Sequence, residues 1–267
     1  MPIHGDRAAL LHRLASALAE ETAFRWSTIP HVAWAPKREW PLLFAHAGKL
    51  YMFGGRETPD SSVLLQFQTS TNRFEPVPIR INDARFPNTL TCSTFVEWGK
   101  RMWLFGGRAE TAVEEGSCSN DMFCFDIEAS MLQHVEQHGN VPHPREGAAA
   151  VEWQGYMLLY GGVNLIDIAE QERFEARHIV PVFHFSTATW THWHTTGDMP
   201  PAVETVEATA LWGDHMYTLT WSPEAGFSMF RLDIPGRKWS RVVQQGALPQ
   251  PRYARGAGCA VESITRS

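Results

Sequence analysis

Hydrophobic positions change their spacing near residue 24, and the two patterns predict different elements. Before that point leucines recur every three or four residues, which marks one face of a helix: Leu10, Leu11, Leu14 and Leu18. Asp6 can cap the first turn of such a helix. We therefore predict a helix over Asp6–Thr22, within an N-terminal helical segment 1–23, packed on the main domain or against a partner element. Arg7 and Arg13 leave a mitochondrial presequence open as an alternative, although Glu20 is unusual in one.

From Phe24 onward, short runs of β-branched and aromatic residues alternate with clusters of Gly, Pro, Asn and Asp. This pattern predicts many short strands joined by tight turns. One apolar strand that ends in two glycines recurs, and its copies end at Gly54-Gly55, Gly106-Gly107, Gly161-Gly162 and, without the glycines, Thr220-Trp221. Successive copies are 52, 55 and 59 residues apart, from 54 to 106, from 106 to 161 and from 161 to 220. Each repeat is therefore long enough for four strands of five or six residues.

Two further markers recur in the same register. The first is a pair of apolar residues seven positions apart: Phe67 and Phe74, Phe125 and Leu132, Phe183 and Trp190, Leu232 and Trp239. In the third copy, Phe185 with a shorter turn is an alternative to Phe183. The second marker is a junction sequence, in which 139–145 matches 246–252 and 197–201 is a shorter version. Three markers with one period indicate a genuine repeat.

These residues resemble the kelch repeat, whose units form the four-stranded blades of a β-propeller of the galactose oxidase-like type. The resemblance covers residues 24–262 and implies an all-β fold of about four recognisable blades plus part of a fifth. The propeller domain is expected over 24–267, with blades near 41–78, 89–138, 147–196 and 204–244 and a partial blade at 253–267. Kelch rings are commonly closed by strands from both chain ends. The last blade here has no middle strand pair, so we expect a ring that is incomplete at the C-terminus.

The aromatic content fits such a ring. The chain has 11 Trp, 15 Phe and 5 Tyr, and we expect large side chains such as Trp103, Phe125 and Trp239 to fill the wedges between blades. The second strand of a blade, such as Met157–Tyr160, is continuously apolar, which suits burial on both faces. Core packing thus accounts for the aromatic residues without a cofactor, and we expect none.

Charge and cysteine content narrow the function classes. A net charge of −6 and a pI of about 6.0 argue against a general nucleic-acid binder, which needs a basic surplus. Apolar runs are too short for a membrane span, so we expect no membrane partner. With no export signal we expect a cytoplasmic or nuclear protein. The four cysteines are then thiols, although the spacing of Cys118 and Cys124 would allow a disulfide across a loop.

We interpret the chain as a non-catalytic adaptor or scaffold that binds an unknown protein partner, because kelch propellers most often hold another protein with loops on one face. The candidate loops are Glu57–Ser62, Arg108–Asn120 and Gly162–Arg177. The candidate partner-binding residues are four arginines: Arg56, Arg108, Arg145 and Arg252. The first two follow the double glycines. The other two match the junction arginine of kelch proteins, which supports blade contacts or lines the face around the channel.

The alternative is a metal-dependent enzyme on the same ring, resembling specifier-type lyases or an oxidase. Its ligands would come from an acidic loop at 167–178: Asp167, Glu170, Glu175 and His178. Specifier proteins bind iron through Glu-x-x-x-Asp-x-x-x-His, but Phe174 stands at the middle position here. His192 and His194 lie on one face of a predicted strand and would supply only two ligands. We therefore predict that the chain is not an enzyme.

Overall fold

The computed structural model describes residues 38, 41–55, 63–81, 86, 90–109, 118–163, 178–200, 206, 208–222 and 226–243. All of them belong to one unit of the chain, 35–267. The predicted helix at Asp6–Thr22 and the predicted partial blade at 253–267 lie outside the described residues. Every named element in the described part is a strand. Among these residues no helix has the length and hydrophobicity that crossing a bilayer demands.

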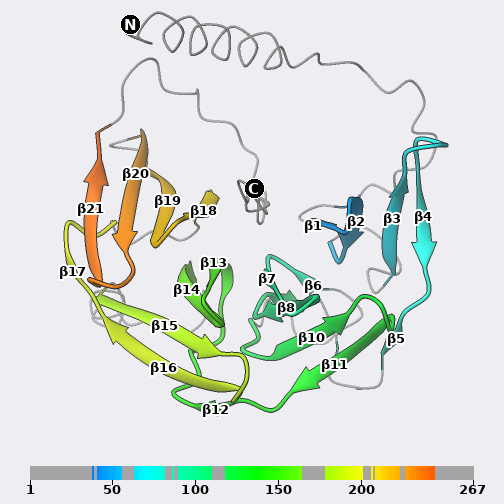
Figure 1. Cartoon of the computed structure of the whole chain (residues 1–267), viewed down its shortest axis with the longest axis horizontal. Coiled ribbons are helices and arrows are strands. Elements are labelled where there is room, and N and C mark those ends of the chain that lie inside the picture. Colours follow the sequence, from blue (N-terminus) through cyan, green and yellow to red (C-terminus); the bar gives the residue numbers. More distant parts are fainter. Residues whose placement is uncertain are drawn as a thin grey trace, which may run out of the picture. The chain divides into compact units, whose positions relative to one another are not determined.

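Four sheets follow one another along the chain, and each is one blade with four antiparallel strands (Figure 1). Blade 1 contains β1 (Leu42–His46), β2 (Lys49–Phe53), β3 (Leu64–Gln68) and β4 (Arg73–Val77). Blade 2 contains β7 (Thr94–Trp98), β8 (Arg101–Phe105), β10 (Met122–Asp126) and β11 (Met131–Val135). Blade 3 contains β13 (Glu146–Trp153), β14 (Tyr156–Val163), β15 (Ile179–His184) and β16 (Thr189–His194). Blade 4 contains β18 (Ala208–Trp212), β19 (His215–Ser222), β20 (Gly226–Asp233) and β21 (Lys238–Val242). The predicted all-β propeller with four recognisable blades is confirmed.

Blades 2, 3 and 4 each carry a short fifth strand that the sequence did not predict. These strands are β5 (Arg80–Ile81), β12 (His138–Gly139) and β17 (Thr196–Gly197). Each comes from the junction that leaves the preceding blade, and each pairs in parallel with the outer strand β11, β16 or β21. Because an unpaired strand edge is a template for unwanted association, the junction segments protect the outer edges of these blades.

The pairs of apolar residues seven positions apart are direct cross-strand partners in all four blades. Phe67 faces Phe74, Phe125 faces Leu132, Phe183 faces Trp190, and Leu232 faces Trp239. In the third blade the structure therefore selects Phe183 rather than the alternative Phe185. Such pairs link the third and fourth strands through their side chains as well as through the hydrogen-bond ladder.

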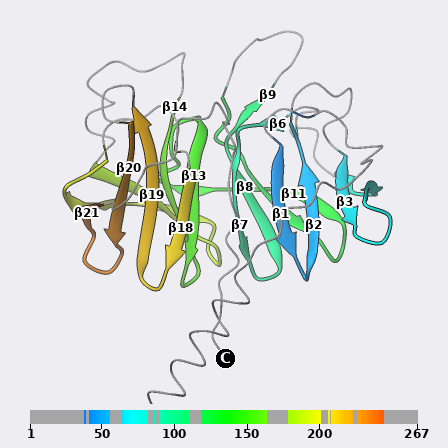
Figure 2. The ribbon, with the colours of Figure 1, turned by 90° about the horizontal axis from the view of Figure 1, so that it is seen from above.

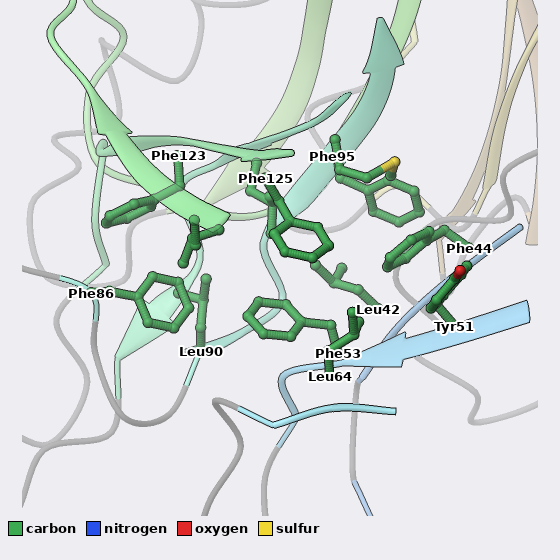
Figure 3. Close-up of a cluster of buried hydrophobic side chains, with 13 residues drawn as sticks. Leu42, Phe44, Tyr51, Phe53, Leu64, Phe86, Leu90, Phe95, Phe123 and Phe125 are labelled. Atoms are coloured by element: carbon green, nitrogen blue, oxygen red, sulfur yellow. The ribbon is translucent and has the colours of Figure 1, made fainter. Parts of the chain in front are cut away.

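Three hydrophobic clusters hold consecutive blades together. The first joins blades 1 and 2 and includes Phe44, Phe53 and Phe125 (Figure 3). The second joins blades 2 and 3 around Trp103, and the third joins blades 3 and 4 around Trp239. Trp103, Phe125 and Trp239 are 6%, 5% and 1% exposed. The prediction that large aromatic side chains fill the wedges between blades is thus confirmed at these positions.

The two strands that belong to no blade form a separate small sheet. β6 (Leu90–Thr91) pairs antiparallel with β9 (Arg108–Ala109), directly after the second double glycine. Arg108 also forms a single antiparallel bridge with Cys118. These pairings tie the chain leaving β8 to the chain entering β7, so they fix where Arg108 lies on blade 2.

Candidate functional site

Each blade has a tight hairpin between its first two strands at one end; at the other end blades 1 to 3 have a longer connection, whereas that of blade 4 has only three residues (Figure 2). The hairpin between its first two strands turns in two residues: Ala47-Gly48, Gly99-Lys100, Gln154-Gly155 and Gly213-Asp214. The connections from second to third strand comprise residues 54–63, 106–121, 164–178 and 223–225. Because the strands are antiparallel, these connections start from the end opposite the hairpins. We call that end the loop face and the other end the hairpin face.

The double glycines bring neighbouring blades together on the loop face. The amide of Gly55 donates to the carbonyl of Leu90 at 3.0 Å, and the amide of Gly107 donates to that of Arg145 at 2.9 Å. A Cβ on Gly106 would lie 2.6 Å from the Arg145 carbonyl oxygen. Gly54 has the same relation to Leu90, also at 2.6 Å. Only glycine permits this approach, so the repeat marker seen in the sequence is a blade-to-blade contact.

The guanidinium group of Arg145 donates hydrogen bonds to main-chain carbonyls of the protein itself. Nη1 donates to the carbonyl of Gly161 at 3.0 Å, and Nε donates to the carbonyl of His143 at 3.1 Å. Burial lowers the pKa of Arg145 to about 10, so the side chain is still a cation at neutral pH. Its backbone also accepts from Gly107 and donates to the Ser119 carbonyl at 3.1 Å. Arg145 therefore joins blade 2 to blade 3 and fixes the end of β14.

Arg38 occupies the same repeat position in blade 1, and the sequence reasoning missed it. Its Nη1 donates to the carbonyl of Gly54 at 2.8 Å and to that of Val63 at 3.2 Å. Phe53 comes just before the first double glycine and pairs with Leu42, four residues after Arg38. Tyr160 holds the same place in blade 3 and pairs with Ala149, four residues after Arg145. The signal was present in the sequence, since Pro36-Lys37-Arg38 resembles Pro144-Arg145. In blade 2 the equivalent residue is Leu90.

Arg108 differs from Arg145 because its side chain reaches the surface. It is 35% exposed, and its Nη1 lies 3.8 Å from Oε1 of Glu146 on blade 3. Its Nε is buried and has no hydrogen-bond partner among the described residues. Because Nε is buried, only the exposed part of the Arg108 side chain can meet an external acceptor. The other two predicted arginines, Arg56 and Arg252, lie outside the described residues.

A serine, an aspartate and a histidine meet beside this junction, and the sequence reasoning did not single them out. Oγ of Ser119 donates to Oδ2 of Asp121 at 2.7 Å, and Oδ1 of Asp121 lies 3.0 Å from Nε2 of His134. In a hydrolytic triad the histidine lies between the serine and the carboxylate. Here the carboxylate lies in the middle, so this set holds the loop in place and leaves Ser119 without a neighbouring base.

The candidate metal ligands are not assembled in the described part of the chain. Asp167, Glu170 and Glu175 lie outside it, and His178 is exposed at the start of β15. The carbonyl of His178 accepts from the amide of Thr195 at 2.8 Å. Within the described ranges, no group of three or more His, Cys, Asp or Glu side chains is arranged to hold a metal ion. The enzyme hypothesis therefore gains no geometric support from these residues.

His192 and His194 lie on the outer strand β16 of blade 3. Desolvation, then the nearby His194, Arg145 and His143, lower the pKa of His192, and a hydrogen bond with the Asn140 backbone partly opposes them. His192 thus belongs to a positively charged neighbourhood that disfavours its protonated form.

We expect an NMR titration to find the pKa of His192 below the ordinary value for histidine. Because protonation is then less favourable in the folded state than in the unfolded state, the contribution of His192 to stability declines as the pH falls through the unfolded pKa. His194→Gln removes one source of charge and should raise the pKa of His192. A His192 pKa at or above the ordinary value would show that the histidine is not desolvated as described.

The disulfide considered between Cys118 and Cys124 is not formed. Sγ of Cys118 lies 3.7 Å from the carbonyl of Val163 on blade 3. Cys124 is buried on β10, and burial raises the pKa of its thiol to about 11. A thiol with so high a pKa is unreactive at neutral pH.

Comparisons with known proteins agree with this architecture. A family model described as the KLHDC2/KLHL20/DRC7 Kelch-repeats domain matches residues 41–264. Acyl-CoA-binding domain-containing protein 5 of Arabidopsis thaliana is 25% identical over 216 residues, which cover 76% of this chain and 31% of the relative. Dynein regulatory complex subunit 7 of Chlamydomonas reinhardtii is 28% identical over 123 residues, which cover 42% of this chain and 10% of the relative. The chain thus spans less than a third of the length of either relative.

Proposed function

Because the chain belongs to this Kelch-repeat family, we propose that it is a non-catalytic interaction module that binds a protein partner through its loop face. Kelch-repeat domains mediate protein interactions and are generally non-catalytic. The algal relative is named as a subunit of a complex, which is in keeping with such a role. The observation that carries the proposal is the contrast between the two ends of blades 1 to 3, with two-residue hairpins at one end and connections of ten or more residues at the other.

The proposed contact surface consists of the connections from second to third strand and the arginines next to the double glycines. Arg108 is its best-supported residue, because its side chain is 35% exposed beside the second double glycine. Such a group suits a carboxylate on the partner. Arg56 and Arg252 are proposed contacts from the sequence pattern. Arg145, also a predicted contact, supports the junction from which Arg108 projects, since its Nε and Nη1 donate to main-chain carbonyls.

A rigid frame is what makes loops effective binding elements. The three hydrophobic clusters and the junction hydrogen bonds hold the strand ends in place. Because the ends of each loop are already fixed, binding a partner costs less conformational entropy. Loops on a rigid scaffold commonly carry function for this reason. The blade junctions described above therefore support binding indirectly, without touching the partner.

The test compares charge reversals on the two faces. The whole chain is used as bait in affinity capture. Specific proteins that bind the unmodified chain should be lost with Arg108→Glu. They should also be lost when residues 164–177 are replaced by a Gly-Ser linker of equal length. Arg101→Glu is the matched control, because Arg101 lies next to a hairpin, is 53% exposed and pairs with Asp126. Each captured protein is then purified, and its affinity for the three variants is measured. Partners that remain bound to both loop-face variants and are lost with Arg101→Glu would place binding on the hairpin face instead.

A further inference from the structure

Three exposed histidines gather at the outer edge of blade 3, beside the junction that enters this blade. His192 and His194 alternate along the outer strand β16, so they lie on the same face of the sheet as Trp190. His143 belongs to the junction and is the third member of the group. The side chains of all three histidines are exposed. We call this group the histidine edge.

Main-chain contacts hold the junction against β16 and bring His143 to the other two histidines. The short strand β12 pairs with Thr189 and Trp190, and the amide of Asn140 donates to the carbonyl of Trp190 at 3.0 Å. A hydrogen bond also joins the ring of His192 to the backbone of Asn140. His143 consequently lies close enough to affect the protonation of His192. The histidine edge is thus assembled by fixed contacts between the junction and the outer strand.

The charged groups around His192 are basic. After desolvation, which is the largest cause, three basic side chains lower the pKa of His192: His194, Arg145 and His143. His194 lies on the same strand, and the other two belong to the junction. Each of them disfavours a positive charge on His192.

The other elements packed against β16 add no opposing charge at this place. The neighbouring strand β15 places Pro181 opposite His192 and Ile179 opposite His194. The short strand β12 contributes His138, which pairs with Thr189 at the other end of β16. The one carboxylate of the segment 136–145 is Glu136, and it is not among the groups that act on His192.

Two histidines of blades 1 and 2 have a different environment. Nδ1 of His46 lies 2.9 Å from Oε1 of Glu97, and Nε2 of His134 lies 3.0 Å from Oδ1 of Asp121. Each of these histidines has a carboxylate of its own chain beside it. Within the described ranges, no ion pair joins the histidine edge to a carboxylate. When the histidine edge is protonated, its positive charge is therefore available to an anion from outside.

We propose that the histidine edge binds an acidic segment of a partner protein and that this binding strengthens as the pH falls. Protonated imidazole rings donate charge-assisted hydrogen bonds to carboxylates. Alternate residues of a strand lie about 6.6 Å apart, so a segment with several carboxylates suits His192 and His194 better than one small anion. In the part of the chain that the structure describes, no three His, Cys, Asp or Glu side chains are arranged for a metal ion, which favours an anion as the ligand. The inference is separate from the loop-face proposal, since it involves neither Arg108 nor residues 164–177.

The direction of the pH dependence follows from the coupling of binding to protonation. A bound carboxylate stabilises protonated histidines, so binding takes up protons and the affinity rises as the pH falls from about 7.5 to about 5.5. The lowered pKa of free His192 shifts its contribution toward the acidic end of this range. In the complex the pKa of His192 should rise, because the carboxylates of the partner oppose the basic neighbours.

The experiment measures binding of a labelled hexaglutamate peptide to the whole chain by fluorescence anisotropy at low salt. The affinity should rise about tenfold over that pH range, because three exposed ion pairs of modest strength act together. In the triple variant His143→Gln, His192→Gln, His194→Gln the rise should shrink to about twofold or less. The matched control is His138→Gln, since His138 is an exposed histidine of the same blade and is not among the groups that act on His192.

NMR of the imidazole resonances locates the bound peptide, and circular dichroism with thermal unfolding establishes that the variants are folded. The peptide should raise the pKa of His192 and leave the resonances of His138 unchanged. Failure of the peptide to bind at about pH 5.5 overturns the proposal, as does a pH dependence that the triple variant retains. Tighter binding of a hexathymidylate oligonucleotide would indicate nucleic-acid phosphates as the ligand and would also overturn it. Because the peptide assay does not involve affinity capture with Arg108→Glu, the two proposals can fail separately.

Discussion

Gly106→Ala is expected to destabilise the protein by about 4 kcal/mol, the sum of backbone strain and a clash in a packed junction. Gly106 has φ +67, and a Cβ there would lie 2.6 Å from the Arg145 carbonyl oxygen and 3.3 Å from that of Ser119. Both neighbours are backbone atoms, so relief requires blades 2 and 3 to move apart. That movement would lengthen the hydrogen bond from Gly107 to Arg145. Chemical denaturation followed by tryptophan fluorescence measures the loss.

Gly99→Ala is the matched control within the same blade. Gly99 has φ +61, close to that of Gly106, but a Cβ there has open space around it. The substitution should therefore cost only the left-handed backbone penalty, about 1 to 2 kcal/mol. Equal losses for the two variants would mean that the glycine pair serves backbone conformation alone and that the blades do not need the close approach.

Arg145→Met is expected to cost about 1 to 3 kcal/mol, because it leaves the part-buried carbonyl of Gly161 without the donor that Arg145 supplies. Methionine keeps much of the side-chain volume and cannot donate a hydrogen bond, so the variant separates the polar contact from packing. Arg38→Met should behave in the same way, since Arg38 donates to Gly54 in blade 1. Denaturant midpoints of both variants, with unchanged slopes, measure the effect.

Arg101→Met provides the contrast for Arg145. Arg101 pairs with Asp126 at 3.2 Å on the hairpin face, where it is 53% exposed. Exposed ion pairs contribute about 0 to 1 kcal/mol because solvent screens them. If Arg145→Met were as mild as Arg101→Met while capture of a partner was lost, Arg145 would be a contact residue rather than a junction residue.

Most of the architecture followed from the periodicity of the chain. The double-glycine strands became β2, β8 and β14, and the degenerate copy became β19. The pairs seven residues apart became cross-strand partners because their spacing is that of a short antiparallel hairpin. These features were readable because they depend on residues that are close in sequence and repeat in the same register.

The candidate site was harder to predict from the sequence, because its contacts join residues that are far apart along the chain. The sequence placed Arg108 directly after a double glycine and Arg145 at a junction, but it did not show that Arg145 donates to main-chain carbonyls while the side chain of Arg108 is part-exposed. That difference arises because Arg145 meets Gly161 of its own blade and Arg108 meets Glu146 of the next. Arg38 was overlooked although its local sequence resembles the junction at Arg145, and its bonds to the carbonyls of Gly54 and Val63 became visible only in the structure.

The sequence by itself determined the number of recognisable blades, their strands and the apolar residues that fill the wedges, because local spacing and side-chain volume set these properties. The tertiary structure alone decided which glycine touches which carbonyl, which junction segment covers which strand edge, and which side chains each described blade packs against the next. Those outcomes depend on contacts between residues a whole blade apart. Leu158 and Tyr217 hold equivalent register positions in blades 3 and 4, yet Leu158 is buried and Tyr217 is part-exposed, since only Leu158 has a described blade packed against it.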